Sequence, residues 1–251
     1  MSADTAVGHA AHPPHLQHHF DTPEQQFEAG KLGMWLFLAT EVLLFSGLFC
    51  AYAIYRASHP ETFRFAHRFL DWRLGGLNTV ILITSSFTMA WGVREAQLGR
   101  RRALAVLLAI TLLCGAGFMT VKYVEYKAKF EHHLLWGTKF SPDPELLAEH
   151  GAAAHESGAE TGWAAGTAPE ALLPKEPPAN MHIFFGIYFL MTGLHGLHVL
   201  MGMLAIGWVL RRAVRGDFSS SYYTPVDLVG LYWHLVDLIW IFLFPLLYLI
   251  S

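Results

Sequence analysis

The segment Leu32–Ile54 reads LGMWLFLATEVLLFSGLFCAYAI, and it decides the fold class. It contains 23 residues and a single charged side chain, that of Glu41. A helix needs about 20 mainly apolar residues to cross the hydrocarbon core of a bilayer. Because the apolar residues occupy all faces of such a helix, its surroundings must be lipid or other helices. We therefore expect a membrane-spanning helix over 32–54.

Four further segments have the same character, and they predict spans at 74–93, 103–121, 181–210 and 226–250. The first three contain no Asp, Glu, Lys or Arg, and the last contains Asp227 and Asp237. The chain of 251 residues is only 15% charged, whereas a soluble domain is about 25% charged. Too little polar sequence remains to enclose five buried helices. The predicted fold class is an all-α integral membrane protein, a five-transmembrane-helix bundle.

The polar parts of the chain set its organisation and orientation. Residues 1–30 form a predicted mobile, His-rich tail, and 31–251 form the membrane domain, interrupted by a polar insertion at about 127–180. The connections 94–102 and 211–215 carry four and three arginines. With five spans both lie on the side of the N-terminus, which the positive-inside rule assigns to the cytoplasm. The C-terminus and the insertion are then expected on the outer side.

Several functional classes find no support. A net charge of −3 provides no basic field for nucleic acid. The sequence contains no Gly-x-Ser-x-Gly motif and no phosphate-binding loop. We therefore predict no catalytic residue on this chain and no nucleic-acid partner.

Five acidic or histidine side chains lie well inside the predicted spans, away from their ends: Glu41, His195, His198, His234 and Asp237. Ionisable groups at membrane depth are costly, so each is a candidate functional residue. Hydrogen bonding between helices, at about 0.6–2 kcal/mol each, is an equally good interpretation. The His-x-x-His pair offers two metal ligands, whereas a catalytic zinc or iron site needs three and an open position. No metal site is predicted.

Trp233 and Trp240 share one face of the last span at seven-residue spacing. The favoured interpretation is lipid-facing bulk and interfacial anchoring. The alternative is that the two rings contact specific lipid chains or a partner subunit.

Motifs from all five spans, in order, resemble those of the five-helix bacterial type of haem-copper oxidase subunit III. They cover about half of the chain and are Trp35–Glu41 with Phe45–Tyr52, Leu77–Ser86, Gly117–Tyr126, Thr192–Val199 and Tyr232–Phe242. Each motif alone is modest, but five in the family's order are a specific signal.

The resemblance implies an accessory subunit of a proton-pumping terminal oxidase that reduces O2 to water in the bacterial inner membrane. Such a subunit binds phospholipids but no haem or copper, which belong to partner subunits. It packs against the catalytic subunit I, with subunit II in the same complex, and supports proton uptake and sustained turnover.

The resemblance also implies roles for single residues. The family's intramembrane carboxylate falls on Glu41, and Asp237 and His234 belong with it to the proton environment. Polar packing or contact with lipid headgroups is expected of four side chains: Glu125, His195, His198 and Trp233.

The insertion between the third and fourth spans, about Trp136 to Pro178, is longer than the family leads us to expect. We expect it to dock another respiratory-complex subunit or a cytochrome c domain on the outer face. Glu41 favours cytochrome c over quinol as the electron donor, because quinol oxidases often carry Asp there. Alternatives are a quinol-oxidase or nitric-oxide-reductase accessory subunit. A self-standing proton channel or transporter is a different class, against which the lack of inverted repeats argues.

Overall fold

The computed structural model describes residues 16–131 and 180–250. The long helices in these ranges are α1 (Pro23–Ser58), α3 (Trp72–Gln97), α4 (Arg101–Glu131), α6 (Met181–Arg215) and α7 (Thr224–Tyr248). All five are long and apolar enough to cross a membrane. A short helix, α2 (Pro60–Ala66), and one 3-10 turn, His67–Phe69, connect α1 to α3. The predicted all-α fold with five spans is confirmed.

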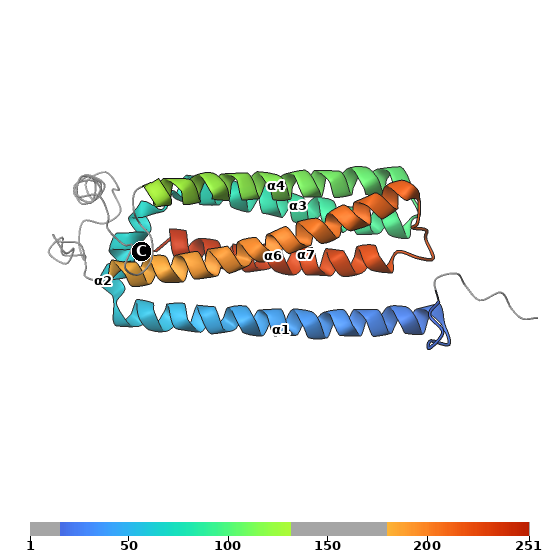
Figure 1. Ribbon diagram of the computed structural model, residues 1–251, viewed down its shortest axis with the longest axis horizontal. Helices are drawn as coiled ribbons and strands as arrows, with labels where there is room; N and C mark the ends of the chain where they lie inside the picture. The colour runs from blue at the N-terminus through green and yellow to red at the C-terminus, as the bar shows by residue number, and fades with distance from the viewer. Residues whose placement is uncertain (1–15, 132–179, 251) are drawn as a thin grey trace, which may run out of the picture.

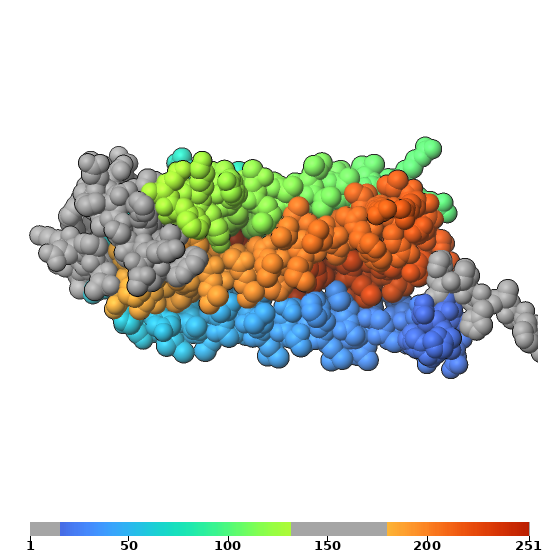
Figure 2. Space-filling view, viewed as in Figure 1, coloured from blue at the N-terminus to red at the C-terminus, as the bar shows by residue number. Residues whose placement is uncertain are grey.

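Four of the helices form a compact bundle, and α1 lies outside it (Figure 1). Within the bundle α3 packs along α4 and α7, and α6 packs against α4 and α7. Helix α1 contacts mainly α7 and, to a smaller extent, α6. Figure 2 shows α1 as an outer layer along one side of the molecule. Its buried residues, Leu38, Phe45 and Tyr52, recur every seven positions, so one narrow face holds it to the bundle.

Local sequence explains where several helices begin and end. The Thr22 hydroxyl accepts a hydrogen bond from the Gln25 amide at 3.1 Å, directly before Pro23 at the first helical turn of α1. Asp71 caps α3 by accepting from the Arg73 amide at 2.8 Å. Gly216, with φ +86°, ends α6 in the left-handed conformation that glycine tolerates best. Because of the Thr22 cap, α1 starts inside the segment predicted as a tail.

The helices also extend beyond the apolar segments that predicted them. Helix α4 reaches Glu131 rather than residue 121. Its 31 residues measure about 46 Å at 1.5 Å per residue, against about 30 Å for the hydrocarbon core. The first residues of the predicted insertion, 127–131, therefore belong to α4, and 132–179 lie outside the described residues.

The centre of the bundle is aromatic, and it contains both tryptophans that were expected to face lipid. Trp233 and Trp240 are completely buried. A Cβ atom added to Gly202 would lie 2.8 Å from the Trp233 ring, and one added to Gly115 would lie 3.1 Å from it. The lipid-facing interpretation is wrong for these two residues, because neighbouring glycines leave space for the Trp233 ring between α4 and α6.

Candidate functional site

The first polar contact joins the peripheral helix α1 to the bundle. The Glu41 Oε2 atom lies 2.7 Å from Nε2 of His198 on α6. The two side chains are only 15% and 10% exposed. The Phe45 ring packs edge-on against the imidazole at 5.3 Å between centroids. A carboxyl and an imidazole from helices far apart in the sequence thus form one buried pair.

The other nitrogen of His198 defines how this pair holds its proton. Nδ1 lies 2.8 Å from the Leu194 carbonyl oxygen, which can only accept, so Nδ1 carries hydrogen. The Nε2–Oε2 contact then contains one proton, on the imidazole or on the carboxyl. Both forms have zero net charge, which lowers the cost of placing Glu41 at membrane depth. A shift of this proton from one member to the other would leave the net charge of the pair unchanged.

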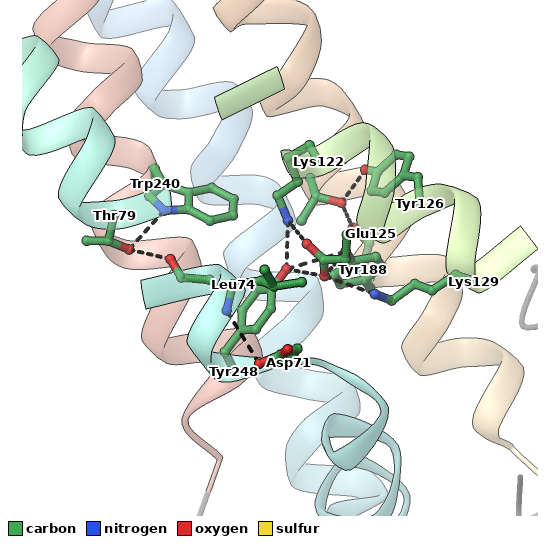
Figure 3. Close-up of polar contacts among 12 residues, drawn as sticks. Asp71, Leu74, Thr79, Lys122, Glu125, Tyr126, Lys129, Tyr188, Trp240 and Tyr248 are labelled. Atoms are coloured by element: carbon green, nitrogen blue, oxygen red, sulfur yellow. Dashed lines mark hydrogen bonds and ion pairs between the residues drawn. The ribbon is translucent and has the colours of Figure 1, made fainter. Parts of the chain in front are cut away.

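A second and larger cluster surrounds Glu125 near the end of α4 (Figure 3). Its Oε2 atom lies 2.9 Å from the Lys122 ammonium, and Oε1 lies 2.9 Å from the Lys129 ammonium. The hydroxyl groups of Tyr188 and Tyr248 donate to the same Oε1 at 2.8 and 2.6 Å. One carboxylate therefore receives four donors from three helices.

Aromatic rings enclose the two ammonium groups of this cluster. Lys122 Nζ lies 4.5 Å from the centroid of Trp240, and Lys129 Nζ lies 4.9 Å from that of Tyr188. Such distances are favourable for cation–π attraction. The three ionised side chains, those of Lys122, Glu125 and Lys129, are 8%, 4% and 5% exposed. The arrangement stabilises buried charge and joins α4 to α6 and α7.

Sequence reasoning placed Glu125 among polar packing or headgroup residues but missed its four partners. Lys122 directly follows the predicted span 103–121, and Lys129 lies in the predicted insertion at about 127–180. The signal that could have found them is the spacing of three and four residues around Glu125, which puts all three charges on one helical face. No sequence signal pointed to Tyr188 and Tyr248.

The remaining predicted residues do not join either cluster. His195 is completely buried between the rings of Phe118 and Trp240, at 5.6 and 5.3 Å between centroids. His234 Nδ1 contacts the Ser86 hydroxyl of α3 at 2.7 Å. Asp237 is buried, and no cation in the described part of the chain pairs with it. Each side chain occupies its own position between helices.

The indole groups of both buried tryptophans donate hydrogen bonds to hydroxyl groups on α3. The Trp233 Nε1 atom donates to the Ser85 hydroxyl at 2.8 Å. The Trp240 Nε1 atom likewise donates to Thr79 at 3.1 Å. Within the described ranges, no three His, Cys, Asp or Glu side chains gather to hold a metal ion.

An apolar groove runs along the outside of α4 and α6, which we call the α4–α6 groove. It consists of two adjoining hollows of about 550 and 500 Å³ that share Tyr126, Phe130 and Gly193. Three glycines of α6 line the groove: Gly186, Gly193 and Gly196. A Cβ atom on Gly196 would meet no atom within 4 Å, so the space beside this residue is open. The lining of the groove is mainly apolar, with Lys122 and Lys127 at one of the two hollows.

Residues 18–140 and 180–251 match the sequence profile of the family described as cytochrome c oxidase subunit III. The chain belongs to this family. The matched ranges contain all five spans and both polar clusters, and they leave out 141–179, most of the predicted insertion. The chain is thus a multi-pass membrane protein of the haem-copper oxidases.

Individual relatives agree with the family. Cytochrome c oxidase subunit 3 of Synechocystis is 32% identical over 219 residues, 87% of this chain and 74% of the relative. That of Thermostichus vulcanus is 29% identical over 225 residues, 88% and 87% of the two chains. Quinol oxidase subunit 3 of Bacillus subtilis is 26% identical over 231 residues, 91% and 92%. Relatives of both oxidase types therefore cover nearly the whole chain.

Proposed function

We propose that this chain is the non-redox subunit III of a bacterial proton-pumping terminal oxidase that takes electrons from cytochrome c. The observation that carries the proposal is the family match over all five spans, together with the Glu41–His198 contact at the position of the family's intramembrane carboxylate. Haem and copper, in this proposal, reside in partner subunits. The chain packs against subunit I, with subunit II in the same complex.

In this proposal the chain influences the protons and lipids around the catalytic subunit and carries out no chemical step itself. The Glu41–His198 pair is buried, neutral in total charge and able to shift its proton. The α4–α6 groove offers a binding surface for phospholipid. Both features support a subunit that holds lipid beside the catalytic subunit and helps it to take up protons over many turnovers.

The proposed orientation places the N-terminus in the cytoplasm. The α3–α4 turn and the α6–α7 connection lie at the same end of the bundle as the start of α1 (Figure 1). Seven arginines lie at this end, at positions 94–102 and 211–215, and the positive-inside rule assigns such an end to the cytoplasm. The C-terminus and the 132–179 segment would then lie on the periplasmic side, where the segment could dock a further subunit or a cytochrome c domain.

Purification of the tagged chain from its native membrane in mild detergent tests the proposal. We expect a haem-bearing partner to co-purify and the complex to oxidise reduced cytochrome c with uptake of O2. Activity with quinol alone would replace the proposed donor. A lone chain that conducts protons in liposomes would refute the oxidase role and support the channel alternative.

A further inference from the structure

A second groove, at the other end of α4, lies between α3 and α4 and combines apolar walls with arginine. This α3–α4 groove measures about 440 Å³. Trp91, Val106 and Leu107 contribute to its apolar wall, and Glu95, Arg100 and Arg102 line its polar end. All the lining residues belong to one helical hairpin, made by α3, α4 and the turn between them.

The charge around this groove is strongly positive. Of the arginines at this end, Arg100 pairs with Glu95 at 3.5 Å, and Arg212 pairs with Asp217 at 3.0 Å. The others form no ion pair with any residue in the described part of the chain: Arg94, Arg101, Arg102, Arg211 and Arg215. An anion at this end would therefore find several guanidinium groups that lack a counterion.

The one acidic side chain in the groove is already engaged. Glu95 Oε1 accepts from the Trp91 indole at 3.2 Å, and Oε2 contacts Arg100. Its side chain is only 7% exposed, whereas that of Arg100 is 67% exposed. Arg100 thus keeps donors that face outward, beside the exposed Arg102. A cationic headgroup would find little free carboxylate here, and a phosphate would find two guanidinium groups.

We propose that the α3–α4 groove binds one anionic phospholipid, with its phosphate between Arg100 and Arg102 and an acyl chain along Trp91 and Val106. Guanidinium groups suit phosphate because their fixed N–H donors match its oxygen atoms. Basic pockets between transmembrane helices are a recognised form of site for anionic lipid headgroups. The inference rests on membrane placement of the chain and not on its role in an oxidase.

The α4–α6 groove provides an internal contrast. The lysine at its rim, Lys127, already pairs with Glu131 at 3.7 Å. Its other lysine, Lys122, is buried and bound to Glu125. The two grooves therefore share apolar walls but differ in available positive charge, and only the α3–α4 groove should select the headgroup.

The test measures the phospholipid that remains with the full chain, purified with whatever partners accompany it. The protein is equilibrated with mixed micelles of mild detergent, phosphatidylcholine and phosphatidylglycerol. It is then washed and analysed by native mass spectrometry. The variant Arg102→Gln removes one phosphate ligand without touching the Arg100–Glu95 pair. We expect about tenfold less retained phosphatidylglycerol, as befits the loss of a hydrogen bond to a charged group.

Two further variants distinguish binding in the α3–α4 groove from nonspecific electrostatic attraction of the lipid to exposed arginines. Arg215→Gln removes an equally exposed and unpaired arginine from the other connection, so it should leave retention unchanged. Ala103 also lines the groove; Ala103→Phe fills part of it while keeping every charge, and it should lower retention as Arg102→Gln does. Equal losses in Arg102→Gln and Arg215→Gln would overturn the proposal, as would full retention by Arg102→Gln or by Ala103→Phe. Because retention is read without oxidase turnover, failure of the proposed function would leave this result unaffected.

Discussion

Replacing Glu125 by Gln should destabilise the bundle strongly, because in the described part of the chain its carboxylate is the only one within ion-pair distance of two buried lysines, Lys122 and Lys129. The carboxylate oxygens lie 2.9 Å from both ammonium groups. Gln keeps the size of the side chain and one acceptor oxygen, but it removes the negative charge. Lys122 and Lys129 would then remain in the protein interior without an ion-pair partner, and only Lys129 would keep the more distant attraction of Asp71.

The expected magnitude follows from the burial of these charges. Removing one partner of a buried ion pair costs about 3–5 kcal/mol. At about 1.4 kcal/mol per factor of ten, the unfolding equilibrium should change roughly a hundredfold to a few thousandfold. Tyr248→Phe removes one hydroxyl, which donates to Glu125 and accepts from Lys122, and it should cost at least about 1.5–3 kcal/mol, the value of one hydrogen bond to a charged group.

The same helix supplies a matched control. Glu131 pairs with Lys127 at 3.7 Å, but both side chains are more than 60% exposed, at 64% and 62%. Glu131→Gln makes the same chemical change in an exposed pair and should cost only about 0.3–0.5 kcal/mol. Reversible unfolding in mixed micelles of SDS and mild detergent, followed by circular dichroism, gives the three free energies. If Glu125→Gln and Glu131→Gln had equal effects, the buried cluster would not stabilise the fold and the reasoning would be refuted.

Three other substitutions, one of them with a matched control, test the remaining contacts. Glu41→Ala should leave the haem content of the purified complex intact but speed inactivation during turnover or reduce retained lipid; wild-type behaviour in both assays would exclude the proposed role. Gly202→Ala should lower the free energy of unfolding by about 1–3 kcal/mol, because its new Cβ would lie 2.8 Å from the Trp233 ring. The control is Gly207→Ala, whose Cβ would meet no neighbouring atom; it should be neutral or slightly stabilising in the same unfolding assay. Trp233→Phe removes the hydrogen bond to Ser85 and should lower the unfolding free energy by about 1 kcal/mol or more; no change would show that the bond adds nothing.

Hydropathy predicted the five spans because the cost of polar groups in hydrocarbon is large and depends on composition alone. It could not predict the ends of the helices, which lie where that cost no longer applies. At the end of α4, the spacing of Lys122, Glu125 and Lys129 continues the helix beyond the apolar run. Their stabilisation requires Tyr188 and Tyr248 from other helices, and no local pattern in α4 indicates them.

For the intramembrane residues too, the sequence identified the residues but did not predict their contacts. Glu41 and the His195-x-x-His198 motif were both recognisable, but only packing decides that α1 meets α6 at His198 and that His195 lies between aromatic rings. The prediction that Trp233 faces lipid was wrong because packing also decides where this ring lies. Lipid and helix interior are equally apolar, so an apolar ring has no hydrophobic preference between them. What separates the two environments is the space left by Gly202 on one neighbouring helix and the acceptor offered by Ser85 on another. In a membrane protein, small residues and hydroxyl groups on neighbouring helices therefore indicate burial better than the apolar residue itself does.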